Sequence, residues 1–150
     1  MHRKIETLVF ALPPSDWHSE EIERIQAKKL GQDRFQLCTP PFFAEGFSKG
    51  DIVLTIQHKQ YGFQVIRRVI IPSGHSTVLL ALNHEANKVD VEHYRQKLQQ
   101  LHCPYLEKEG ELLTLDIPAD QPIQPVFHLL ERGELVGVWN FRVQHMVHAV

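Results

Sequence analysis

The segment Ser73-Gly74-His75-Ser76-Thr77 is the densest group of reactive side chains in this 150-residue sequence. A serine nucleophile, a histidine base and a carboxylate that orients the histidine form a hydrolytic triad, and Asp51 could supply the carboxylate. However, no G-x-S-x-G motif holds either serine in a strained, exposed turn. A polar turn, in which Gly74 takes a positive φ and the hydroxyls bond backbone groups, explains the same residues without a reaction. We therefore assign no catalytic residue.

The same turn is a better candidate for binding a small ligand or anion. Successive backbone N–H groups in a turn can bind an anion, and a nearby arginine would add positive charge. We predict a ligand site where two halves of the chain meet, because clefts between subdomains commonly bind small molecules. Its predicted residues are Asp51, Arg67, Ser73, Gly74, His75 and Ser76.

Metal and cofactor sites are not expected. Zinc sites need three or four ligands at workable spacing, whereas the ten histidines are scattered. His145 and His148 fall in a segment that we expect to be a frayed tail. Cys38 and Cys103 lie in no CxxC pattern, which favours reduced, buried thiols. The sequence also lacks the glycine-rich loops that bind nucleotide phosphates.

Short strands separated by turns must position the candidate residues of the first half. Runs in which apolar and polar residues alternate, or in which β-branched residues are frequent, predict strands at residues 6–12, 34–38, 52–56 and 61–71. Residues 19–29 are ambiguous, because their composition favours a helix whereas the following Gly31-Gln32-Asp33 favours a hairpin turn. We predict a strand there. The aromatic residues of this half are expected to pack in its core: Phe42, Phe43, Phe47, Tyr61 and Phe63.

The second half has a different pattern. Strands are expected at residues 76–82, 103–107, 112–117 and 135–143, and helices at 87–101 and 120–132. Asp90 is a candidate N-cap of the first helix, and Gly133 is expected just past the end of the second. This order predicts an α+β protein: a small β-barrel-like sheet (1–72) followed by a ferredoxin-like βαββαβ half (73–150). The last strand is a candidate edge for pairing.

Charge and hydropathy exclude several function classes. The formal net charge is -2 and the sequence pI is near 6.5, which argues against a dedicated nucleic-acid binder. Residues 1–75 carry a net +2 and residues 76–150 a net -4. No apolar run reaches the roughly 20 residues needed to cross a bilayer, and no secretory signal is recognisable. We expect a cytoplasmic protein.

Two motifs together resemble the bacterial family known as Domain of Unknown Function 4265. They are Pro41-Phe42-Phe43-Ala44-Glu45-Gly46 with Gly50-Asp51-Ile52-Val53, and Ser73-Gly74-His75-Ser76-Thr77. The resemblance implies a stand-alone bacterial cytosolic protein and favours the hairpin at residues 22–37, but it implies no activity or cofactor. Any site shared by the family would match Phe42, Phe43, Gly46, Asp51, Ser73, Gly74, His75 and Ser76 here. Leu79 departs from the expected pattern, in which a basic residue often follows the second motif.

The functional expectation is a non-enzymatic protein-binding module of the immunity type, which neutralises a toxin domain. The net negative charge of the second half would suit a basic partner. The alternative is a small-molecule or anion site at the junction of the two halves. Hydrolysis at that junction is a distant third.

Overall fold

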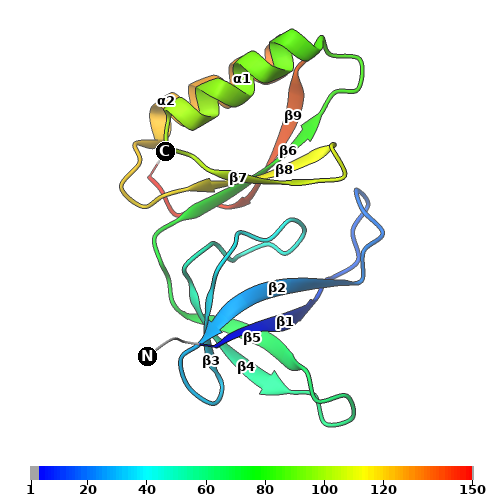
Figure 1. Cartoon of the computed structure of the whole chain (residues 1–150), viewed down its shortest axis with the longest axis vertical. Coiled ribbons are helices and arrows are strands. Elements are labelled where there is room, and N and C mark those ends of the chain that lie inside the picture. Colours follow the sequence, from blue (N-terminus) through cyan, green and yellow to red (C-terminus); the bar gives the residue numbers. More distant parts are fainter. Residues whose placement is uncertain (1–3, 150) are drawn as a thin grey trace.

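The computed structural model describes residues 4–149, which form two helices and two β-sheets in an α+β arrangement. Seen from the side, the helices, a four-stranded sheet and a ring of strands follow one another from top to bottom (Figure 1). The ring is built by the first half of the chain. The sheet and both helices are built by the second half.

Five strands form the ring: β1 (Ile5–Ala11), β2 (Ile22–Lys29), β3 (Arg34–Leu37), β4 (Ile52–Gln57) and β5 (Gln64–Ile71). Each strand pairs antiparallel with the next, and a parallel pairing of β1 with β5 closes the ring. Alternate side chains point inward, as the period of two requires. They fill the interior with residues that include Leu8, Ile25, Ala27, Phe35, Leu37, Val53 and Ile66.

The ambiguous segment 19–29 contains a strand, as predicted. Ile25 and Ala27 are buried while Arg24, Gln26 and Lys28 are exposed, which is a period of two and not of 3.6. The turn into β3 is closed by the Leu30 N–H, which donates to the Arg34 carbonyl at 2.9 Å. Pairing with both neighbours therefore outweighs the helical preference of the Glu, Gln, Ala and Lys side chains.

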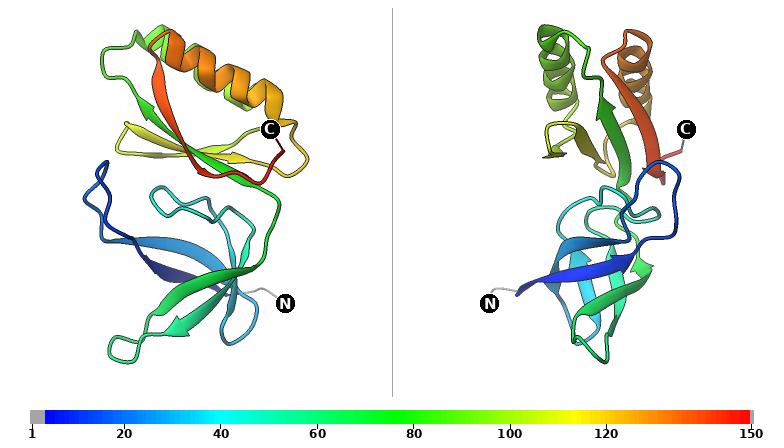
Figure 2. Two further views of the ribbon diagram at one scale, coloured as in Figure 1. Left: turned by 180° about the vertical axis from the view of Figure 1, so that it is seen from behind. Right: turned by 90° about the vertical axis from the view of Figure 1, so that its right-hand side faces the viewer.

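The second half adds β6 (Ser76–Leu82), α1 (Lys88–Gln100), β7 (Tyr105–Lys108), β8 (Leu112–Ile117), α2 (Ile123–Leu135) and β9 (Trp139–His145). Its strands lie in the order β7-β8-β6-β9, and all neighbours are antiparallel. β9 is thus at an edge of the sheet, as predicted. Both helices cover the face turned away from the ring (Figure 2). They bury a core that includes Val78, Leu80, Leu98, Leu115, Val126, Leu130 and Trp139.

Two details of the helices differ from the prediction. The N-cap of α1 is Asn87, whose side chain accepts the Val89 N–H at 2.8 Å, and Asp90 lies inside the first turn. Gly133 does not end α2 but lies within it, packed against the ring of Trp139. The helix continues to Leu135, so β9 starts four residues later than expected.

The aromatic prediction is right for the loop after β3 and wrong for the β4–β5 hairpin. Phe43 and Phe47 are buried, and Phe42 packs against the same core. Tyr61 is 68% exposed, and Tyr61 and Phe63 stack with His58 at the hairpin tip. Three rings stacked on one another shield part of their apolar surface without reaching the core.

Residues 72–75 connect the two sheets, from the end of β5 to the start of β6. The sheet face opposite the helices packs on the loop 38–51 of the first half. There, Thr114 Oγ1 donates to the Pro41 carbonyl at 2.7 Å. The division into domains 1–72 and 73–150 stays a prediction. In the described part of the chain, neither helix is long and apolar enough to cross a membrane.

Candidate functional site

Asp51 lies at the centre of the junction between the two halves and is 0% exposed. One carboxylate oxygen, Oδ2, accepts the Ser48 N–H at 2.9 Å, and the other, Oδ1, accepts the Ser73 N–H at 2.8 Å. The side chain therefore ties the loop before β4 to the linker after β5. Both oxygens accept backbone N–H groups, and in the described part of the chain no histidine ring is hydrogen-bonded to them, so Asp51 orients no histidine.

Ser73 and Gly74 form the polar turn that the sequence suggested. Ser73 Oγ donates to the Lys49 carbonyl at 2.7 Å and accepts the His75 N–H at 3.2 Å. Gly74 has φ +87°, and a Cβ there would lie 3.0 Å from the Cβ of Ala119. Glycine is needed for both the backbone conformation and the space.

His75 pairs with a carboxylate from the second sheet. Its Nδ1 lies 2.7 Å from Oδ1 of Asp116, a buried residue of β8. An ionised carboxylate only accepts hydrogen bonds, so Nδ1 carries the proton and Nε2 remains available. Neither Ser73 nor Ser76 bonds the His75 ring, and the hypothetical triad with Asp51 is not formed.

Ser76 holds the C-terminal segment instead. The Nε2 of His148 lies 2.8 Å from the Pro118 carbonyl, which can only accept, so that nitrogen carries the proton. His148 Nδ1 then accepts the Ser76 hydroxyl at 2.6 Å, and Ser76 Oγ accepts the Val147 N–H at 2.9 Å. His145 Nδ1 lies 2.8 Å from Ser48 Oγ. The expectation of a frayed tail at these histidines is wrong, because hydroxyls of the junction anchor both rings.

Arg67 does not join the other predicted residues. It lies exposed in the middle of β5, six residues before Ser73, and six extended residues span about 20 Å. The remaining five residues do lie together at the junction. Their polar atoms mostly bond one another or the backbone, so the group serves mainly to join the two halves.

His75 is the member of the predicted set that lines an open pocket. This junction pocket has a volume of about 250 Å³, and Lys28, Lys49 and Cys38 also line it. No carboxylate shares its lining. Two ammonium groups line it, and the His75 imidazole beside them already pairs with the Asp116 carboxylate, so the two lysines are the cations that would attract an anion.

A larger hollow involves residues that the sequence analysis missed. The aromatic cleft, defined by Trp17, Phe43, Lys108, Phe141 and Arg142, has a volume of about 480 Å³. A second hollow of about 350 Å³ adjoins it and shares Trp17, Phe43 and Arg142. The β1–β2 loop that carries Trp17 rises from the ring toward the second sheet (Figure 1). The cleft therefore lies between the two halves.

Cations lie over the rings of the aromatic cleft. The guanidinium carbon of Arg142 is 4.7 Å from the centroid of the Trp17 ring, and Lys108 Nζ is 4.9 Å from that of Phe43. Arg142 also lies 3.9 Å from a Glu45 carboxylate oxygen. These contacts pre-order long side chains that would otherwise lose rotamer freedom when a ligand binds.

Glu23 holds the loop that carries Phe43. Its two carboxylate oxygens accept the backbone N–H groups of Phe42, Phe43 and Ala44 at 2.6, 2.9 and 2.8 Å. From the second half, Gln144 Nε2 donates to the Phe42 carbonyl at 2.8 Å. The Phe43 side chain is thus positioned by both halves of the protein.

One sequence signal could have pointed to this cleft. Trp17 follows Pro13-Pro14 in a segment to which no element was assigned, and a large aromatic side chain in a loop is a common binding anchor. The remaining wall could not be predicted, because Phe43, Lys108 and Phe141 come from three distant segments.

Among residues 4–149, no group of three or more His, Cys, Asp or Glu side chains lies together in a way that could hold a metal ion. The two cysteines are free thiols. Cys103 is buried, and its burial raises the pKa of the thiol to about 12, with a further contribution from the Asp116 carboxylate. Cys38, which was also expected to be buried, is instead half-buried and lines the junction pocket.

We expect this difference to decide thiol reactivity. Because the thiolate is the nucleophile, iodoacetamide at about pH 8 should label Cys38 in the folded protein and leave Cys103 unmodified. Mass spectrometry of tryptic peptides measures both sites, and labelling in denaturant serves as the control in which both cysteines react. Equal labelling of the two thiols in the native protein would contradict the structure.

The comparisons with known proteins agree with this architecture. A solved structure titled "Novel crystal structure of a hypothetical protein from Neisseria gonorrhoeae" is similar to this chain with a TM-score of 0.79 and 15% sequence identity. The match covers 99% of this chain and 100% of the other, and at this identity it shows the fold alone. A search of curated proteins found no match.

The sequence also matches a family model over residues 23–141, which include the loop 38–51 and the turn at residues 73–77. This range covers most of the chain and contains both motifs that carried the resemblance. The chain therefore belongs to the family described as Domain of unknown function (DUF4265).

Proposed function

We propose that this protein is a non-enzymatic protein-binding module that receives an extended segment of its partner beside β9. The observation that carries the proposal is the position of the aromatic cleft next to an edge strand. Phe141 and Arg142 belong to β9 and also line the cleft. On β9 the Phe141 N–H donates to a Glu134 carboxylate oxygen and the Gln144 carbonyl accepts the Gly46 N–H. A segment paired with the remaining main-chain groups of the outer edge would be within reach of the cleft for its own side chains.

The chemistry of both features supports this proposal. An edge strand offers unpaired main-chain groups to another chain, and side-chain pockets beside it supply specificity. Trp and Arg are the residue types that most often dominate binding energy at protein interfaces. In this protein, Trp17 and Arg142 are in contact before any partner binds.

The charge around the cleft favours a basic segment. Lys108 and Arg142 are its cations, whereas four carboxylates line the cleft and the adjoining hollow: Asp16, Glu20, Glu45 and Glu109. The lining thus carries a net charge of -2. Residues 76–150 carry a net -4. Such a field speeds the association of a basic partner.

The specific form of the proposal is an immunity role, in which the partner is a basic toxin domain. The test is co-expression with the product of the neighbouring gene, followed by affinity measurement on the purified pair. We expect the wild-type protein to form a stable complex, and Trp17→Ala and Arg142→Ala each to lose about tenfold or more in affinity. Arg68→Ala, on the exposed face of β5, is the matched control and should bind normally. The proposal fails if no complex forms or if the three variants bind alike.

A second candidate function is binding of a small anion in the junction pocket. The observation in its favour is that Lys28 and Lys49 line that pocket beside His75, whose Nε2 is left available by the contact of its Nδ1 with Asp116. Thermal-shift screening with phosphorylated and carboxylated metabolites tests it. A ligand that raises the melting temperature should lose its effect in His75→Ala and keep it in His84→Ala, a control histidine on the surface. A hit that survives His75→Ala would place the ligand elsewhere.

We also infer the finer fold assignments from the strand order. In the second half, the strands of each strand–helix–strand unit are separated by one antiparallel strand, which supports a ferredoxin-like arrangement. The parallel β1–β5 pairing that closes the first sheet supports a small β-barrel.

A further inference from the structure

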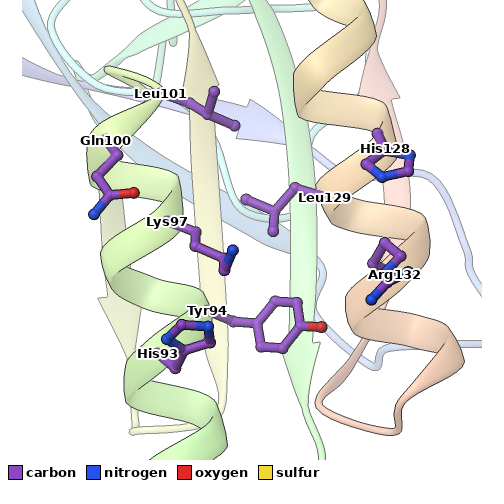
Figure 3. Close-up of a pocket in the computed structure, with 8 residues that line it drawn as sticks. All are labelled: His93, Tyr94, Lys97, Gln100, Leu101, His128, Leu129 and Arg132. Carbon is purple, nitrogen blue, oxygen red and sulfur yellow. The ribbon is translucent and has the colours of Figure 1, made fainter.

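A groove runs between the two helices, on the side of the protein away from the ring. This helix groove has a volume of about 550 Å³ and lies outside the junction and the aromatic cleft. Figure 3 shows Lys97 and Tyr94 of α1 reaching toward α2, with Leu129 of α2 pointing into the space between the helices.

Two pairs of basic residues face the groove with the same spacing. His93 and Lys97 are four residues apart on α1, and His128 and Arg132 are four apart on α2. Residues at this spacing share one face of a helix, about 6 Å apart along its axis. The two helices therefore present four nitrogen-bearing side chains to one space.

These four side chains have no acidic partner. No Asp or Glu lines the groove, and in the described part of the chain none of the four forms an ion pair. The contrast on the same helix is Arg95, which lies 2.5 Å from the Glu107 carboxylate. The protein neutralises a cation beside the groove and leaves those within it unneutralised.

The floor of the groove is apolar and ordered. Leu129 is 8% exposed, and the Tyr94 ring packs edge-on against the buried Trp139 ring with centroids 5.5 Å apart. Leu101 completes this apolar surface at the end of α1. A hollow with an apolar floor and a few polar groups that converge from two elements has the features of a small-molecule site.

We propose that the helix groove binds a small organic polyanion, with its acidic groups between Lys97 and Arg132 and its apolar body against Tyr94 and Leu129. The bound anion would relieve the repulsion between the facing cations and form charge-assisted hydrogen bonds with them. This site is independent of the partner surface at β9 and of the junction pocket.

Isothermal titration at low ionic strength tests the proposal with four probes. Tripolyphosphate and citrate distinguish phosphate from carboxylate as the preferred acidic group. ATP and adenosine test the apolar body with and without the anion. We expect ATP to bind more tightly than tripolyphosphate, adenosine to show no binding, and added salt to weaken every anion that binds.

Substitutions locate the site. Lys97→Gln and Arg132→Gln should each weaken ATP binding about tenfold, which corresponds to about 1.4 kcal/mol. Lys88→Gln, an exposed position on the same helix outside the groove, is the matched control and should leave affinity unchanged. NMR amide shifts on titration should map to α1 and α2, and unchanged melting temperatures should show that the variants are folded.

Three results would overturn the proposal. The first is the absence of binding by ATP, tripolyphosphate and citrate alike. The second is an equal loss of affinity in Lys88→Gln, which would indicate nonspecific attraction to the surface. The third is a set of shifted amides confined to residues outside the two helices.

Discussion

Replacing Asp51 with alanine is expected to lower the free energy of unfolding by about 3–5 kcal/mol. The change removes two charge-assisted hydrogen bonds, each worth roughly 1.5–3 kcal/mol, and leaves the Ser48 and Ser73 N–H groups without their acceptor. Domains of this size are stable by only about 5–15 kcal/mol, so the loss is a large fraction of the total. Urea denaturation followed by circular dichroism measures it.

Two further variants separate the role of the carboxylate from a general effect of substitution. Asp51→Asn keeps one acceptor oxygen but sets an amide NH₂ against the other backbone donor. Its free energy of unfolding should therefore lie between those of the wild-type protein and Asp51→Ala. Asp120→Ala, at an exposed turn, should change stability by less than about 0.5 kcal/mol. A loss below about 1 kcal/mol in Asp51→Ala would show that the junction does not depend on this side chain.

Gly133→Ala is the second substitution with a large expected effect. It should lower the free energy of unfolding, although helix propensity alone would raise it. Alanine inside a helix is usually favoured over glycine by about 1 kcal/mol. Here a Cβ would lie 2.7 Å from Cζ2 of Trp139 and closer still to two other atoms of that ring. The ring cannot move easily, because it is 1% exposed and its Nε1 donates to the Leu130 carbonyl at 3.0 Å.

Overpacking of this kind costs typically 1–3 kcal/mol and sometimes more, so the steric term should outweigh propensity. We expect a net destabilisation of about 3 kcal/mol by thermal or urea unfolding. Gln124→Ala, exposed on the same helix, is the control for propensity and should be neutral. In a Trp139→Leu background the cost of Gly133→Ala should shrink, because the two residues are coupled. A stabilising Gly133→Ala would refute the close contact.

The strands were predictable where local pattern and burial agree. β6 and β8 have the bounds expected from their mainly apolar sequences, Ser76–Leu82 and Leu112–Ile117, because both lie inside the sheet and are covered on two sides. Segment 22–29 was harder, since its composition suits a helix while the turn residues that follow it suit a hairpin. Turn chemistry at Gly31 decided that case correctly.

Errors arose where a residue's role depends on a distant partner. A glycine near a helix end often stops the helix, but Gly133 instead makes room for the ring of Trp139. His148 looked like part of a free tail because its partner, Ser76, lies 72 residues earlier. The aromatic cleft was missed for the same reason, since its walls meet only after both halves have folded.

Most residues of the candidate site could be predicted from the sequence, but the contacts between their side chains could not. The sequence placed Asp51, Ser73, Gly74, His75 and Ser76 near one another, and the structure brings them to one junction. The partner of His75 turned out to be Asp116, which reaches it from β8. Nothing in a linear pattern distinguishes that carboxylate from the seventeen other acidic side chains of the chain.

The anchoring of His145 also has a consequence for synthesis on the ribosome. Ser48 meets this histidine 97 residues later in the chain, and the Gly46 N–H donates to the Gln144 carbonyl. At a synthesis rate of about 5–20 residues per second, the loop that carries Gly46 and Ser48 waits roughly 5–20 seconds for β9. During that interval the buried face of this loop is open to chaperones and to other nascent chains. A transcript truncated before β9 would leave it open permanently.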